Sequence, residues 1–213
     1  MRSDIIGHWY LKDLGEPFLN ILNCDPSERE KIVRELKERY DRSYFHEEYL
    51  SGRDEVERTL YRLFKDRGGK PQIERPVYCF LGLNPSELIY SRREYYDFKF
   101  FKIEDIPSEV ISFTYPGSIA SIQIAEQERA KEFRSAYHGK LYLKDEIHDA
   151  IEEFGMPGID FIPIGSRQHD VLVEAQVWSI SIFDEIDEVS DVEASFLPWI
   201  TNPPKERAGL KKD

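Results

Sequence analysis

The clearest alternation of apolar and polar positions lies at residues 171–178, in the sequence Val-Leu-Val-Glu-Ala-Gln-Val-Trp. One parity holds three valines and an alanine, and no Gly or Pro interrupts the run. This pattern predicts a β-strand with one buried face. Because side chains alternate along a strand, Glu174 and Gln176 would project side by side from the other face, between Leu172 and Trp178. A carboxylate and a carboxamide in this position indicate either a binding site or a solvated edge.

Apolar spacing predicts the remaining elements of the chain. Short runs of β-branched and aromatic residues indicate strands, and spacings of three and four indicate amphipathic helices. The expected strands cover residues 6–11, 76–82, 97–103, 110–115, 159–164 and 171–178, and the last two would form a hairpin if they are adjacent. The expected helices begin near residue 26 and then cover about 45–65, 84–96 and 142–154, whereas residues 118–135 fit either type.

Capping residues set the limits of the helical region. Asp25 precedes Pro26 at a first helical position, and Glu28 follows three residues after Asp25. Gly68 and Pro71 end the second helix. The pattern predicts an α+β fold, with a mixed, mostly antiparallel sheet and a helical insert near residues 26–66. We expect one domain over residues 1–200 and a C-terminal tail over 201–213.

Composition narrows the class of protein. The 213 residues are 40% hydrophobic and 13% aromatic, which is enough for one substantial core. The chain has no apolar run long enough for a transmembrane helix, and its N-terminus lacks the apolar region of a signal peptide. With two isolated cysteines, Cys24 and Cys79, we expect a cytoplasmic protein. The net charge of -12 disfavours general binding to a phosphate backbone, but not binding of a small nucleotide.

One interpretation of the polar strand is a metal-dependent nuclease. Asp160, Glu174 and Gln176 resemble the motif of PD-(D/E)xK nucleases, in which an Asp on one strand precedes Glu-x-Lys on the next. In that family the two carboxylates bind Mg²⁺, which activates a water molecule for attack on phosphorus. The chain departs from the motif at Gln176, where Lys is usual, because Gln carries no positive charge.

A second interpretation comes from a resemblance to the ADP-ribosyltransferase-like superfamily. Residues 6–22, from Ile-Gly-His-Trp onward, resemble the family's opening strand, His and short helix. Residues 76–90, followed by 97–103, are similar to its unit of strand, loop, helix ending in Tyr, and strand. Glu174 then falls on a late strand, where the family carries its catalytic Glu.

The resemblance implies roles for individual residues. His8 would bind the ribose or amide of NAD, Tyr78 or Tyr90 would stack on nicotinamide, and Glu174 would stabilise the oxocarbenium-like centre, with a protein or nucleic acid as acceptor. A fixed negative charge in an active site stabilises positive charge that develops beside it in the transition state. The chain departs from the family by its helical insert and by a second His-Gly pair at His138.

A third interpretation is a non-catalytic acidic partner protein of the immunity or antitoxin kind. Six acidic residues lie within 184–193 with no intervening basic residue, and such a run could meet a basic partner. The enzyme interpretations need different neighbours for Glu174. The transferase requires His8 and an aromatic residue in the same cleft, whereas the nuclease requires Asp160 as a joint metal ligand.

Overall fold

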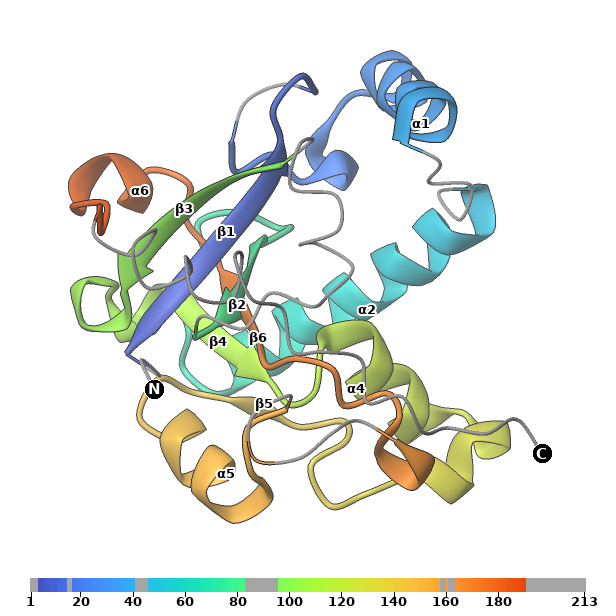
Figure 1. Ribbon diagram of the computed structural model, residues 1–213, viewed down its shortest axis with the longest axis vertical. Helices are drawn as coiled ribbons and strands as arrows, with labels where there is room; N and C mark the ends of the chain where they lie inside the picture. The colour runs from blue at the N-terminus through green and yellow to red at the C-terminus, as the bar shows by residue number, and fades with distance from the viewer. Residues whose placement is uncertain are drawn as a thin grey trace, which may run out of the picture.

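The computed structural model describes residues 4–14, 17–40, 46–82, 96–157, 160 and 164–190. Its centre is a six-stranded sheet in which all neighbouring strands are antiparallel, in the order β3-β1-β2-β6-β4-β5 (Figure 1). The strands are β1 (Ile5–Leu11), β2 (Val77–Leu81), β3 (Tyr96–Lys102), β4 (Ile111–Thr114), β5 (Leu141–Tyr142) and β6 (Glu174–Val177). The helices are α1 (Pro26–Tyr40), α2 (Glu47–Asp66), α4 (Ser118–Glu126), α5 (Ile147–Phe154) and α6 (Ile182–Glu185). The α+β prediction is confirmed, with α1 and α2 inserted between β1 and β2.

Strand register divides the sheet into two faces. Gly7, Phe80, Glu174 and Thr114 lie in one row across four strands, so their side-chain positions share a face. We call this the polar face, and α2 and α4 pack over part of it (Figure 1). The opposite, apolar face is the main core, where α5 and α6 pack on buried residues that include Ile6, Val77, Cys79, Leu81, Phe101, Ile111, Phe113, Val173, Ala175 and Val177.

The predicted helix starts are confirmed by their hydrogen bonds. The Asp25 carboxylate accepts from the backbone N–H groups of Ser27 and Glu28, at 2.9 and 3.0 Å. His46 caps α2, because its Nδ1 accepts from the N–H of Tyr49. These bonds satisfy backbone donors that have no partner within a helix.

The structure corrects the prediction for residues 171–178. The strand itself is shorter, since β6 begins at Glu174, and Val171 is 47% exposed. Gln176 and Trp178 lie on the face expected to be either a binding site or a solvated edge, and both are fully buried. The reason is the position of β6 between β2 and β4, where helices cover both sides of the sheet. The predicted buried face is confirmed, since Val173, Ala175 and Val177 are all buried. The other face is largely buried as well, so the alternative of a solvated edge is wrong.

Two further boundaries differ from the prediction. Both edges of β6 are occupied, by β2 and by β4. Of the strand expected over 159–164, only residues 160 and 164 are described, and neither lies in a strand. Residues 141–142 form β5 rather than the start of a helix, and Glu146 accepts from the N–H of Leu143 in the turn before α5. The helix expected over 84–96 lies outside the described residues except for Tyr96, which belongs to β3. The tail at 201–213 also lies outside them. Among the described helices, none has the length and apolar character that a membrane crossing requires.

Candidate functional site

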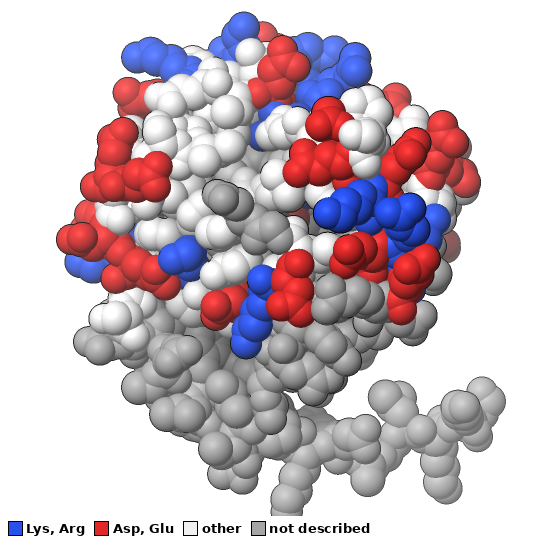
Figure 2. Space-filling view, turned by 90° about the horizontal axis from the view of Figure 1, so that it is seen from above, with Lys and Arg blue, Asp and Glu red and all other residues white. Residues whose placement is uncertain are grey.

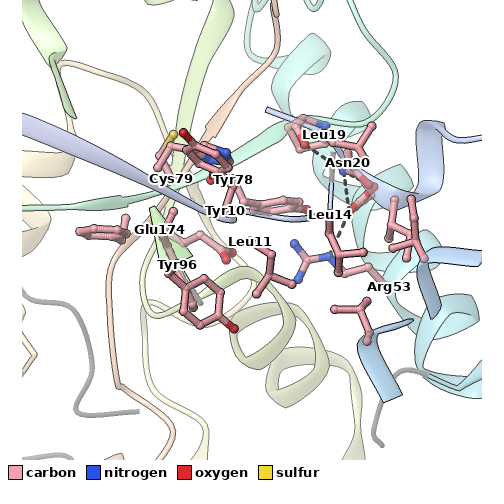
Figure 3. A pocket seen from close by; sticks show the side chains of 18 of the residues that line it. Tyr10, Leu11, Leu14, Leu19, Asn20, Arg53, Tyr78, Cys79, Tyr96 and Glu174 are labelled. Atoms are coloured by element: carbon pink, nitrogen blue, oxygen red, sulfur yellow. Dashed lines mark hydrogen bonds and ion pairs between the residues drawn. The ribbon is translucent and has the colours of Figure 1, made fainter. Parts of the chain in front are cut away.

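A pocket opens where β1 and β2 cease to pair. The ladder between them covers two residue pairs, whereas β1 pairs with β3 along seven. Beside the unpaired parts of both strands lies a cavity of about 350 Å³, the first pocket (Figure 3). It lies between the sheet and the helices α1 and α2. Its lining includes His8, Trp9, Tyr10, Asn20, Leu36, Tyr49, Arg53, Glu57, Tyr78, Phe80, Tyr96 and Glu174.

His8 makes two hydrogen bonds beside this opening, on the apolar face of the sheet. Its Nδ1 donates to the carbonyl of Tyr78 at 2.9 Å, and its Nε2 accepts from the N–H of Phe18 at 3.0 Å. Burial lowers the pKa of His8 to about 4, so the ring is neutral near neutral pH. Both ring nitrogens are engaged within the protein, which gives His8 a positioning role. The ligand contact that the resemblance implies would require one of these hydrogen bonds to break.

Arg53 and Tyr78 form the centre of the first pocket. The Arg53 guanidinium lies over the Tyr78 ring, 3.8 Å from its centroid. The face of an aromatic ring attracts a cation in this position. Burial opposes the charge on Arg53, but Tyr78, Glu174 and Glu57 outweigh it and raise the pKa of the guanidinium. Burial also raises the pKa of Tyr78 well above its ordinary value, so its hydroxyl stays protonated.

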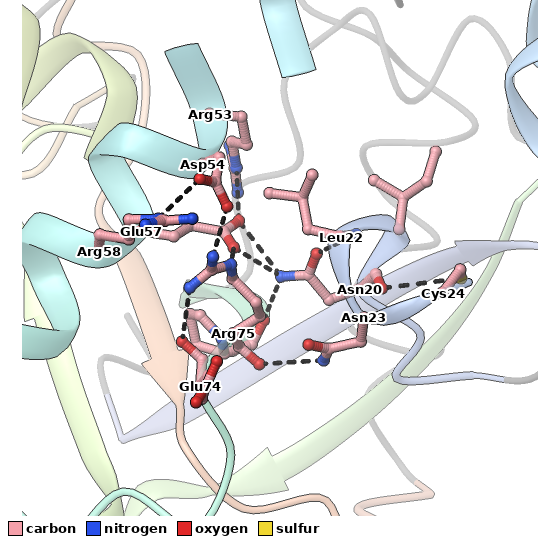
Figure 4. A network of polar contacts seen from close by, with 12 residues as sticks. Asn20, Leu22, Asn23, Cys24, Arg53, Asp54, Glu57, Arg58, Glu74 and Arg75 are labelled. Atoms are coloured by element: carbon pink, nitrogen blue, oxygen red, sulfur yellow. Dashed lines mark hydrogen bonds and ion pairs between the residues drawn. The ribbon is translucent and has the colours of Figure 1, made fainter. Parts of the chain in front are cut away.

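A buried carboxylate fixes the position of Arg53. Glu57 is fully buried and accepts from Arg53 Nε at 3.0 Å and from the Asn20 amide at 3.2 and 3.3 Å (Figure 4). Arg75 lies 3.5 Å from the same carboxylate and also pairs with Asp54. Burial raises the pKa of Glu57, and the charge of Arg53 opposes that rise. Through this network, helix α2 of the helical insert contributes side chains to the site.

Glu174 lies at the opposite wall of the first pocket. Its Oε2 accepts from the backbone N–H of Ser118 at 2.7 Å, at the first turn of α4. In Figure 3 the Glu174 carboxylate and the Arg53 guanidinium point toward each other across the cavity. Positive and negative charge thus face each other across a space that a ligand could enter.

A second pocket of about 500 Å³ adjoins the first. The two share Arg53, Leu172 and Glu174, which we call the pocket junction. Near it, the buried hydroxyls of Tyr78 and Ser118 have no hydrogen-bond partner among the described residues. The second pocket is lined by Arg53, Gly117, Ser118, Ile119, Ala120, Gln123, Ile124, Gln127, Ala130, Gln168, His169, Val171, Leu172 and Glu174.

The structure brings together three of the residues predicted for the transferase site. His8, Tyr78 and Glu174 line the first pocket, although His8 and Glu174 belong to opposite faces of the sheet by register. Tyr90 lies outside the described residues. Sequence reasoning missed Arg53 and Glu57, whose spacing of four on α2 was the only local signal that they form a pair.

The nuclease residues have separate environments. Asp160 accepts from the N–H of Met156 at 2.6 Å, within its own loop, and does not lie on a strand paired with β6. Gln176 is fully buried, where it donates to Thr114 and accepts from Ser112. The described residues contain no group of three or more His, Cys, Asp or Glu side chains suited to hold a metal ion. The two-strand carboxylate arrangement expected for Mg²⁺ is therefore not formed.

The acidic stretch is partly neutralised. Glu188 accepts from Lys99 Nζ at 2.8 Å, and residues 191–193 lie outside the described part of the chain. On the face shown in Figure 2, acidic and basic side chains lie beside each other, with uncharged residues between them. This arrangement adds no support to the partner-protein interpretation.

Comparison of the chain with family models, curated proteins and solved structures found no match.

Proposed function

We propose that the first pocket binds NAD and that the protein transfers its ADP-ribosyl group to an acceptor. The observation that carries the proposal is the convergence of Tyr78, Arg53 and Glu174 in one cavity, with opposite charges on opposite walls. NAD has an anionic diphosphate and a ribosyl carbon that becomes cationic as its bond to nicotinamide breaks. The pocket holds Arg53, the Glu57 carboxylate that pairs with it, and the Glu174 carboxylate on the opposite wall, and a cation with a separate carboxylate suits such a molecule.

The protein's own groups fit these tasks. Glu174 is held by the N–H of Ser118, and its negative charge would stabilise the ribosyl carbon as the glycosidic electron pair leaves with nicotinamide. The acceptor then forms the new bond to that carbon and loses a proton. The apolar lining of the pocket would accommodate the planar nicotinamide ring. The buried Tyr78 hydroxyl, which lacks a partner among the described residues, provides a hydrogen bond for a ligand oxygen.

The test is substitution of Glu174 by Gln. The amide oxygen can still accept from the Ser118 N–H, so the fold should be kept while the charge is lost. We expect release of nicotinamide from NAD to fall about 100-fold or more, while NAD binding measured by calorimetry changes little. Glu152→Gln, on an exposed position of α5, is the matched control and should retain wild-type activity. Absence of NAD binding by the wild-type protein, or equal activity of Glu174→Gln, would contradict the proposal.

A further inference from the structure

Arg53 connects the two pockets. It lines both, and neither lining contains another Lys or Arg among the described residues. A ligand that occupies both pockets must pass the pocket junction, where Arg53 supplies the positive charge. The part of such a ligand at the junction is therefore expected to be anionic.

The guanidinium is preorganised for this contact. Its Nε is bonded to Glu57, and its plane packs over Tyr78, which together restrict its orientation. Glu57 also interacts with Arg75 and Asn20, so its negative charge is shared between two arginines. The terminal nitrogens of an Arg side chain match the oxygens of a phosphate well, and a rotamer that is already fixed loses little entropy on binding.

Two hydroxyls add to the same junction. Ser118 is 1% exposed, and its Oγ, like the Tyr78 hydroxyl, has no hydrogen-bond partner among the described residues. A buried hydroxyl without a partner destabilises a protein, and a ligand oxygen removes that cost. Ser118 lines the second pocket and Tyr78 the first, and Arg53 lines both.

We infer that Arg53, Tyr78 and Ser118 form a diphosphate subsite, so that a dinucleotide spans both pockets. The inference rests on the proposed function and deepens it. The nicotinamide riboside half then occupies the first pocket beside Glu174, and the adenosine half occupies the second. The lining of the second pocket includes the carboxamides of Gln123 and Gln168, which offer donors and acceptors to a base, and apolar side chains that could contact its ring.

Calorimetry with NAD, ADP-ribose and nicotinamide riboside tests the inference, because only the first two contain a diphosphate. Arg53→Met should weaken NAD and ADP-ribose about 10- to 100-fold, the effect expected when charge-assisted hydrogen bonds are lost. It should leave nicotinamide riboside within about 3-fold of wild type. Arg53→Lys, which keeps the charge without the planar fork, should lie between wild type and Arg53→Met. Arg62→Met, on an exposed position of the same helix, is the control.

The double variant Arg53→Met with Glu57→Gln addresses folding, because it removes the carboxylate that Arg53 neutralises. It should unfold cooperatively and show the same selective loss of diphosphate ligands. Unchanged NAD affinity in Arg53→Met, or equal weakening of all three ligands, would overturn the inference.

Titration with inorganic pyrophosphate separates the two proposals. If wild type fails to bind NAD but binds pyrophosphate in a manner that Arg53→Met abolishes, the proposed function fails and the anion subsite stands. If wild type binds neither, both are overturned.

Discussion

The two faces of the central sheet use the same strands for different purposes. On the apolar face, Ala175 and Val177 of β6 lie in a continuous core of aliphatic and aromatic side chains. On the polar face, Glu174 and Gln176 of the same strand bond to named partners, and a pocket borders Glu174. The apolar face is held mainly by burial, which has no direction, whereas the polar face combines apolar packing with hydrogen bonds, which do. The difference teaches that the hydrogen bonds of the polar face depend on individual residues, and this is the face on which we propose that the ligand binds.

The largest expected effect concerns the apolar face. Phe113→Ala removes a fully buried ring on β4 and should lower the free energy of unfolding by about 3–5 kcal/mol. Urea unfolding gives the loss, and calorimetry on the folded protein should give nearly unchanged NAD affinity. A selective loss of affinity at full stability would contradict the separation of the two faces.

A polar-face substitution should cost less but act through hydrogen bonds. Gln176→Leu leaves the buried hydroxyls of Thr114 and Ser112 without the carboxamide and should destabilise the protein by about 2–3 kcal/mol. Adding Thr114→Val removes one of the hydroxyls that lost its partner, so the double variant should recover part of the lost stability. If the two substitutions instead destabilise the protein additively, the hydrogen bonds of Gln176 are not what stabilises the polar face.

The free energy of unfolding should depend on pH through His8. Its folded pKa of about 4 lies below the ordinary value of 6.5, so the unfolded state binds more protons between these values. The stabilisation is complete above 6.5 and is lost as the pH falls toward 4. From about pH 7.5 to about pH 5 the contribution amounts to about 2 kcal/mol.

The measurement compares unfolding of wild type and His8→Gln at both pH values. His8→Gln should be less stable at the higher pH but should lose about 2 kcal/mol less on acidification. Substitution of His148, exposed on α5, is the control. Equal pH dependence of His8→Gln and wild type would rule out His8 as the source.

The smallest expected effect lies at the rim of the apolar face. Lys99 and Glu188 form a partly exposed ion pair, and Glu188→Gln should change stability by less than about 1 kcal/mol. Thermal unfolding at low and high salt would measure it, and the difference between the two proteins should shrink with salt. A larger, salt-insensitive effect would assign this pair a structural role beyond the rim.

Most of the fold could be predicted from local patterns in the sequence. The Asp25 cap, the limits of α2 and the runs that form β1, β2, β3 and β4 depend on neighbours close in sequence, which a linear pattern records. The start of α5 could not be predicted, because β5 forms only by pairing with β4, far away in the chain. The burial of Gln176 had the same cause, since two neighbouring strands and the helices over them decide it.

For the candidate site, the sequence by itself selected Tyr78, Glu174 and His8 as residues on strands. Alternation along a strand fixes which neighbours share a face, and in this way it separated Glu174 from the aliphatic residues of β6. Only the tertiary structure decided that His8 is engaged at both nitrogens, and that Arg53 from the inserted helix faces Glu174 across a cavity. A charge contributed from a helix to a sheet depends on packing between distant segments, and no periodicity of the chain records that contact.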